Sequence, residues 1–162
     1  MYAPTEVSED AKKDEFYEGL QQTIDEAPRR DLKIVMGDFN AKLGGDPAGL
    51  EKAVGPFTSA SDTNEHGSRL ITFCSYNNLC IGNTYFQHRR IHKATWSSPD
   101  GRTVNEIDLV CLSNRWRTSL LDTRANRGAD VGSDHYLVRA SMKLKLKQQK
   151  RHCIALPLTQ LD

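Results

Sequence analysis

Four short polar clusters, residues 2–5, 37–40, 105–108 and 132–135, stand where a predicted helix or strand begins or ends. Between them they carry carboxylates, a carboxamide, an imidazole and a phenol. Hydrolysis of a phosphodiester needs a base that deprotonates water, a carboxylate that holds a divalent ion, and a cation or hydrogen-bond donor on the phosphate. One cluster alone is more often a turn, since Asp and Asn favour turn positions. The set of four predicts an active site.

Two of the clusters contain residues that we expect to pair. Asp108 interrupts an apolar run, and a buried carboxylate is costly unless another group pairs with it. His135 is the natural partner, because a carboxylate fixes the tautomer of an imidazole and raises its pKa. Asp38 and Asn40 are two positions apart, so on a strand both would face the same way. The alternative for Asp38, Asn40 and Asp134 is a structural role in turns or caps.

The elements that would position these clusters alternate between helix and strand. Apolar spacing and capping residues predict helices over 8–27, with Ser8 as the cap, and over 68–77. Apolar runs predict strands over 32–36, 79–86, 94–97, 104–112 and 136–146, and a Gly- and Pro-rich stretch predicts a long loop over 46–62. This pattern predicts an α/β domain.

Bulk composition limits the class of protein. The chain has 162 residues, the size of one domain, and 38% of them are hydrophobic. No apolar run approaches the roughly 18 residues that span a bilayer, and no secretory leader is visible. Cys74, Cys80, Cys111 and Cys153 show neither zinc spacing nor disulfide density, which predicts reduced thiols in an intracellular protein.

Charge is uneven although the net value is only +1. Residues 1–31 carry nine acids and four bases, residues 86–127 carry eight bases and four acids, and residues 143–151 carry five bases and no acid. A basic second half suits a phosphate-rich partner. The alternative is that these Lys and Arg side chains only solvate a surface.

Three motifs in this order, "GDFN", "SSPDG…IDLV" and "SDHYLV", resemble the endonuclease/exonuclease/phosphatase superfamily, the DNase I-like fold. The longer sequence pattern "YAPT…VMGDFNAKLG…ATWSSPDGRTVNEID" is similar to the endonuclease domain of RTE- or BovB-type LINE retrotransposons. The resemblance covers residues 2–146. It implies the second half of a DNase I-like α/β sandwich, with a mixed, largely antiparallel sheet and flanking helices.

The resemblance also implies a role for each motif residue. Asp38 would deprotonate water, Asn40 would hold the phosphate or that water, and Asp108 would orient His135 on the scissile phosphate. Asp134 would bind Mg²⁺ or Mn²⁺, directly or through water. Tyr2 would reach the phosphate, and Trp96 would line the cleft. The candidate set is therefore Tyr2, Asp38, Asn40, Trp96, Asp108, Asp134 and His135.

Compared with that family, residues 1–146 would be a partial domain that lacks its N-terminal half and one metal-binding Glu, and residues 147–162 a basic linker or tail. We therefore expect a Mg²⁺-dependent DNA endonuclease of the abasic-endonuclease-like type with weak or absent activity in isolation. The partial domain would expose the apolar face of its sheet, which self-association or a complementing N-terminal half would cover. DNA is the expected partner, not a membrane, and the nucleus the expected location. The alternative is an inactive remnant that binds nucleic acid or protein; a small-phosphoester phosphatase is a third class, which the LINE-like wording disfavours.

Overall fold

The computed structural model describes residues 1–46, 48–128 and 132–144. Along the chain these form, in order, α1 (Asp10–Glu26), β1 (Ile34–Asp38), α2 (Glu65–Tyr76), β2 (Leu79–Ile81), the 3₁₀ turns η1 (Gly82–Tyr85) and η2 (Arg90–His92), β3 (Trp96–Ser97), β4 (Val104–Asn105), β5 (Asp108–Ser113), the 3₁₀ helix η3 (Asn114–Ser119), β6 (Leu120–Asn126) and β7 (Leu137–Met142). Within the described part, neither α-helix has the length and apolar composition needed to cross a bilayer.

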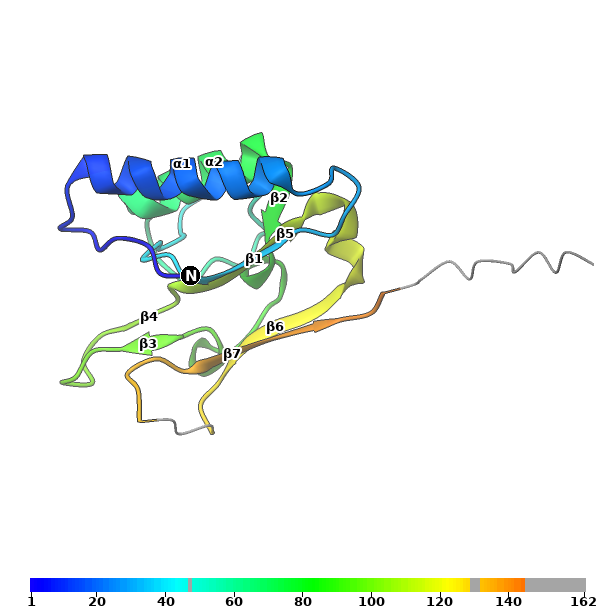
Figure 1. The fold of residues 1–162 in the computed structure, drawn as a ribbon. Helices are drawn as coiled ribbons and strands as arrows, with labels where there is room; N and C mark the ends of the chain where they lie inside the picture. The colour runs from blue at the N-terminus through cyan, green and yellow to red at the C-terminus, as the bar shows by residue number, and fades with distance from the viewer. Residues whose placement is uncertain (47, 129–131, 145–162) are drawn as a thin grey trace, which may run out of the picture.

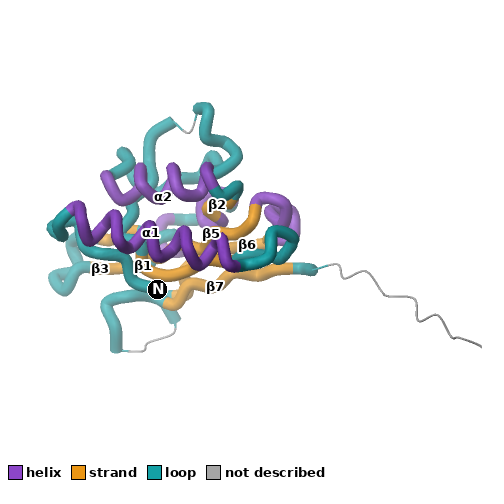
Figure 2. The backbone as a smooth tube through the Cα atoms, turned by 45° about the horizontal axis from the view of Figure 1, so that its top comes forward, coloured by secondary structure: helices purple, strands orange, loops and turns teal. Residues whose placement is uncertain are grey.

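The central sheet has the order β1-β5-β2, and both pairings are antiparallel. The helices α1 and α2 lie on one side of it, whereas the antiparallel hairpins β3–β4 and β6–β7 lie on the other (Figure 1). Figure 2 shows the two helices running across the same face. The β1–β5 register places Asp38 opposite Asp108, so two of the predicted site carboxylates meet at one end of the sheet.

The main core lies between the helices and the central sheet. It joins residues from α1, α2 and all three strands, among them Leu20, Val35, Leu70 and Ile81. A smaller cluster on the other side of the sheet contains Cys80, Leu112 and Leu120, with residues from η1, η3 and β7 against it. Apolar burial of this kind is the main force that fixes the layers. Ile34 and Met36 on β1 remain 38% and 57% exposed.

The predicted elements are mostly present, with corrections to both helices and to several strands. The helix cap at Ser8 is wrong: Glu9 occupies the cap position without a side-chain cap bond, and the Ser8 hydroxyl lies 3.1 Å from that of Thr5. The second helix begins earlier than predicted because the Asn64 side chain accepts from the amide of Gly67. The thiols of Cys74, Cys80 and Cys111 are free and buried, and Cys153 lies outside the described residues.

Two predicted strands are shorter than expected and one strand was missed. The strand predicted over 79–86 ends at Ile81, where the chain turns into η1. The strand predicted over 104–112 is two strands, because residues 106 and 107 separate β4, which pairs with β3, from β5, which pairs with β1 and β2. β6 was not predicted, since Asp122 and Arg124 obscure its apolar alternation. The tail predicted over 147–162 lies outside the described residues.

Gly37 precedes the first site residue and permits a close approach of two backbones. Its φ is 153°, and a Cβ at this position would lie 2.1 Å from the carbonyl oxygen of Met1. That oxygen accepts from the amide of Asp38, and Ala3 donates to the carbonyl of Asp38, so residues 1–3 run beside β1. Glycine is therefore required where this segment meets the site.

We expect Gly37→Ala to separate residues 1–3 from β1 at a cost of about 1–3 kcal/mol, as overpacking does elsewhere. Amide hydrogen exchange at Ala3 and Asp38 should accelerate, because their bonds depend on this contact. Gly19→Ala is the matched control, since nothing lies within 4 Å of its added Cβ. Unchanged exchange at Ala3 in the Gly37 variant would contradict the prediction.

Candidate active site

His135 lies between two carboxylates at the end of the central sheet. Its Nδ1 is 2.9 Å from Asp108 Oδ2, a hydrogen-bond distance, and its Nε2 is 3.9 Å from Asp38 Oδ2. Asp38 is buried, and Asp108 and His135 are half-buried. The structure therefore brings together three residues that are distant in sequence, and the Asp108–His135 contact is the pairing expected from the cost of a buried carboxylate.

The surroundings shift the pKa values of two of these groups. Burial raises the pKa of Asp38; the charges of Asp108 and Asp134 act in the same direction, while the amide of Asn40 and the charge of His135 act against it. Burial lowers the pKa of His135, but the hydrogen bond and charge of Asp108 and the charges of Asp38 and Asp134 outweigh it, so its net pKa is raised. The raised pKa makes the Asp38 carboxylate a stronger base than an ordinary one, and the raised pKa of His135 favours its protonated form.

Asn40 does not share a strand face with Asp38, so that part of the prediction is wrong. β1 ends at Asp38, and Asn40 adopts a φ of 51°, in the left-handed region. The amide of Asn40 donates to Asp38 Oδ1 at 2.8 Å, which makes a tight Asx turn. The side-chain nitrogen donates to the carbonyls of Ala3 and Pro4 at 3.1 and 3.3 Å. Asn40 therefore ties β1 to the segment that carries Tyr2.

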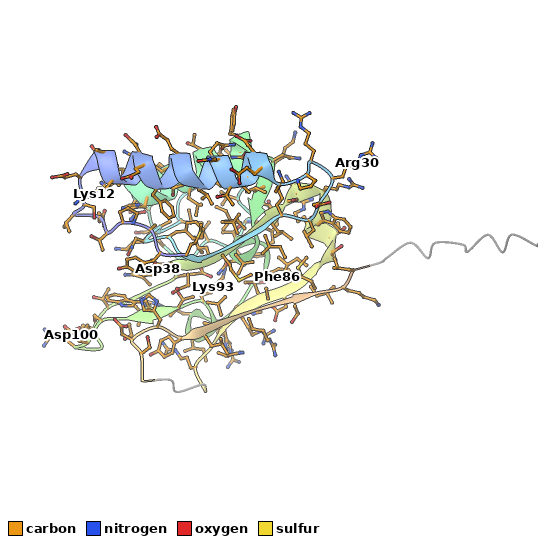
Figure 3. All side chains as sticks on the ribbon, viewed as in Figure 1. Lys12, Arg30, Asp38, Phe86, Lys93 and Asp100 are labelled. Carbon is orange, nitrogen blue, oxygen red and sulfur yellow. The ribbon has the colours of Figure 1, made fainter. Side chains whose placement is uncertain are left out.

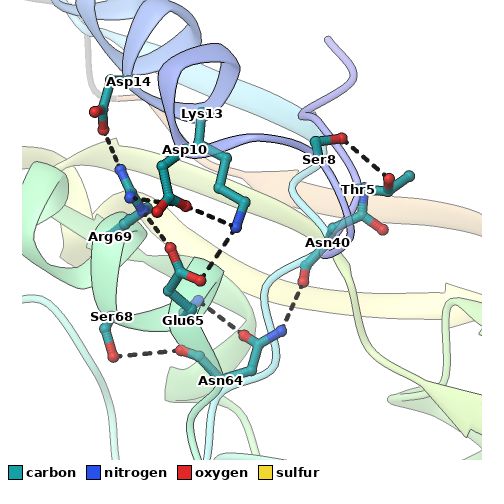
Figure 4. A network of polar contacts seen from close by, with 11 residues as sticks. Thr5, Ser8, Asp10, Lys13, Asp14, Asn40, Asn64, Glu65, Ser68 and Arg69 are labelled. Carbon is teal, nitrogen blue, oxygen red and sulfur yellow. Dashed lines mark hydrogen bonds and ion pairs between the residues drawn. The ribbon is translucent and has the colours of Figure 1, made fainter.

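Asn64 holds this turn from the other side. Its Nδ2 donates to the carbonyl of Asn40 at 3.0 Å (Figure 4). Its Oδ1 accepts from the amides of Lys42 and Gly67. The same side chain thus caps α2 and fixes the Asn40 turn. Beside it, Glu65 pairs with Lys13 of α1 at 3.1 Å, which connects the two helices.

Trp96 and Asp134 flank His135, and Tyr2 lies beside Asp38. Tyr2 is 65% exposed and forms a backbone bridge with Asp38. Trp96 is half-buried on β3, bridges His135 through the backbone, and donates from Nε1 to Asp134 Oδ2 at 2.8 Å. Asp134 itself is exposed. Figure 3 shows Asp100 at the tip of the β3–β4 turn, away from Asp38.

Thr95 is a buried residue of the site that sequence reasoning missed. Its hydroxyl accepts from the amides of Ile107 and Asp108, both at 3.0 Å, and its carbonyl accepts from the amide of Tyr136 at 2.7 Å. One residue therefore holds the chain beside both Asp108 and His135. Nothing in its sequence position distinguishes it from an ordinary strand threonine, because all its partners are main-chain groups.

The described side chains do not by themselves assemble a metal cage. No three His, Cys, Asp or Glu residues within the described ranges are grouped so as to hold an ion. The carboxylates of Asp38 and Asp108 face His135, and Asp134 accepts from Trp96. Carboxylate oxygen is the donor type that Mg²⁺ prefers, and Mg²⁺ commonly uses only one or two carboxylates together with water and substrate phosphate.

Comparison with known proteins gives the family of the chain. A family model described as endonuclease-reverse transcriptase matches residues 1–139, so the chain belongs to that family. Its curated relatives include craniofacial development protein 2 of Bos taurus, 42% identical over 147 residues, and that of Tragulus javanicus, 41% identical over 147 residues. These alignments cover 91% of this chain but 24% and 25% of the two relatives, so the chain spans about a quarter of their length.

Two solved structures share the fold. The endonuclease domain of TRAS1, a telomere-specific non-LTR retrotransposon, matches with a TM-score of 0.57 at 13% identity, over 82% of this chain and 52% of that one. The 3′ phosphatase NExo from Neisseria, bound to product DNA hairpin, matches with a TM-score of 0.58 at 19% identity, over 85% and 56%. The predicted family and the predicted DNase I-like fold are both confirmed.

Proposed function

We propose that this chain carries the phosphate-handling part of a DNA endonuclease, of the type found in retrotransposons. The observation that carries the proposal is His135, held by Asp108 through Nδ1 with Nε2 directed at Asp38. Membership of the endonuclease-reverse transcriptase family supports nuclease chemistry, and the DNA hairpin bound by one structural neighbour supports DNA as the substrate.

The geometry supports a distinct task for each residue. Asp38, whose pKa is raised, is the proposed base that takes a proton from water. The imidazolium of His135 donates from Nε2 to a phosphate oxygen and stabilises the charge that develops there. At 3.9 Å, Asp38 Oδ2 and His135 Nε2 are too far apart to occupy each other with a hydrogen bond. Both atoms therefore keep their capacity for the reacting groups.

The other candidate residues support these two. Asp108 keeps the ring of His135 oriented, and Asn40 holds the segment that presents Tyr2 to the phosphate. Trp96 sets the position of Asp134 through their hydrogen bond. We propose Asp134 as a carboxylate that would hold a Mg²⁺ or Mn²⁺ ion, an ion that commonly uses one or two carboxylates together with water and phosphate oxygens. Bound there, the ion would neutralise phosphate charge.

The test is nicking of supercoiled plasmid by the purified chain with Mg²⁺, compared with the same reaction in EDTA. A parallel reaction with an oligonucleotide bearing a 3′ phosphate separates strand cleavage from the phosphatase reaction named for one structural neighbour. Mg²⁺-dependent nicking supports the proposal. A folded chain that cleaves neither substrate would contradict it and leave the alternative, a module that binds nucleic acid or protein.

The proposed roles predict a bell-shaped pH profile. Activity needs Asp38 ionised and His135 protonated, and both pKa values are raised, above 3.8 and 6.5 respectively. The acidic limb should therefore lie above the range of an ordinary carboxyl, and the basic limb above that of an ordinary imidazole. Asp108→Asn removes the charge that favours the imidazolium, so the basic limb should move to lower pH.

This profile is measured as kcat/KM for a short duplex against pH. Asp122→Asn is the matched control, because Asp122 contacts a different histidine, His88, at 2.7 Å. The control should leave the basic limb in place. A basic limb that stays unchanged in Asp108→Asn would show that His135 does not act as the proposed acid.

A further inference from the structure

Asn83 is a buried residue whose side chain bonds to the main chain of β5. It follows the end of β2 and is only 1% exposed. Its Nδ2 donates to the carbonyl of Asp108 at 3.2 Å, and its Oδ1 accepts from the amide of Val110 at 2.9 Å. The amide therefore satisfies the two peptide groups on either side of Leu109, as a neighbouring strand would.

A buried ion pair sets the direction of this amide. Asn83 Nδ2 also donates to Glu106 Oε1 at 3.2 Å, and Glu106 Oε2 lies 3.6 Å from Lys93 Nζ. Lys93 donates further to the carbonyls of Phe57 and Asn83. Lys93 and Glu106 are 5% and 8% exposed, and charges so deeply buried persist only where partners surround them. Since a carboxylate only accepts, the nitrogen of Asn83 must face Glu106.

Asp108 is consequently held from two directions. Thr95 accepts from its amide at 3.0 Å, and Asn83 donates to its carbonyl. None of the hydrogen bonds and ion pairs described for Asn83, Glu106 and Lys93 involves the side chains of Asp38 or His135. The network thus has no place in the proposed chemistry, although it is attached to the main chain of the residue that orients His135.

We propose that Asn83, supported by Glu106 and Lys93, is a positioning residue that fixes the main chain of Asp108 and so the contact of Asp108 with His135. Its catalytic consequence rests on the function proposed above. Its structural consequence, the geometry of the Asp108–His135 contact, does not depend on that function.

Asn83→Asp is the sharpest variant, because it keeps the shape of the side chain and an acceptor for Val110. It removes the donor to Asp108 and places a second carboxylate against Glu106. We expect kcat to fall about 10- to 100-fold with KM within about twofold, as misplacement of a catalytic group by about 1 Å does elsewhere. Asn77→Asp is the matched control, because it removes the donors to Gln21 and Phe73 at the end of α2.

A double-mutant cycle distinguishes positioning from general loss of structure. If Asn83 acts through Asp108, Asn83→Asp should lower kcat by less than about twofold in an Asp108→Asn background. Asn77→Asp should leave kcat unchanged in both backgrounds. Independent, multiplicative losses from Asn83→Asp and Asp108→Asn would overturn the proposal.

The second readout needs no activity. At a fixed alkaline pH, ring ¹⁵N shifts should show neutral His135 protonated on Nδ1, facing Asp108. Asn83→Asp and Asp108→Asn should both shift the ring toward the Nε2-protonated tautomer, while Asn77→Asp should not. This shift in a chain that cleaves nothing would retain the positioning role and reject the nuclease. An unchanged tautomer in folded Asn83→Asp would overturn the positioning role even in an active nuclease.

If Asn83→Asp does not fold, Asn83→Ser takes its place in both readouts. The serine side chain is uncharged and too short to span both peptide groups.

Discussion

Asp38→Asn is expected to lower the rate of plasmid nicking by at least about 100-fold, the lower end of what a general base contributes. The substitution keeps the size of the side chain and an oxygen that accepts from the amide of Asn40. It removes only the capacity to take a proton from water. The single-turnover rate with excess protein measures this loss without a contribution from product release.

The same variant should be at least as stable as the original chain at neutral pH. Burial raises the pKa of Asp38, so the fold disfavours its ionised form, and a neutral amide relieves that cost. An inactive yet stable variant would separate chemistry from folding. The control is Asp25→Asn on α1, an exposed carboxylate that bonds Gln21. Retention of more than half the rate in Asp38→Asn would reject Asp38 as the base.

Phe39→Ala is expected to cost about 3–5 kcal/mol of unfolding free energy, the usual range for a buried aromatic residue. Phe39 is fully buried in the main core, and its amide donates to the carbonyl of Ile107 at 3.0 Å. Phe39 lies between Asp38 and Asn40 in the sequence, so the burial of its ring in the main core anchors the turn that these two residues form. The loss is a large share of the roughly 5–15 kcal/mol that stabilises a domain.

Urea titration followed by circular dichroism measures this cost. Tyr76→Ala is the control, because its side chain is 81% exposed and its loss should change stability by no more than about 0.5 kcal/mol. A cost below about 1 kcal/mol in Phe39→Ala would mean that the core closes over the missing ring or that the turn is anchored elsewhere.

One contact of the candidate site could be predicted from the sequence, because a carboxylate within an apolar run is costly to bury and demands a partner. Asp108 in an apolar run pointed to His135, and the structure brings the two into contact. The two helices and β1 followed from spacing and turn residues. Membership of the family rested on the order of three motifs, which no physical pattern alone would supply.

What could not be predicted are the residues whose partners are main-chain groups. Thr95 bonds to the amides of Ile107 and Asp108, and Asn83 bonds to the main chain of β5 as well as to Glu106, so no contact with a predicted site side chain reveals either residue. β6 was hidden because Asp122 and Arg124 interrupt it, yet they pair with each other at 2.5 Å. Asn40 was expected on a strand but adopts a left-handed turn, because the residue types in this stretch do not distinguish the two backbone conformations.

Asn64 joins two tasks in one side chain, since it caps α2 and holds the carbonyl of Asn40. Conversion of Asn64 to aspartate, by mutation or by slow deamidation, affects these tasks in opposite directions. A carboxylate at the start of α2 still accepts from Gly67 and interacts better with the helix dipole. A carboxylate cannot donate to the carbonyl of Asn40, so the turn beside Asp38 would lose this hydrogen bond. This single change would therefore keep the cap of α2 while removing a hydrogen bond that holds the turn of the candidate site.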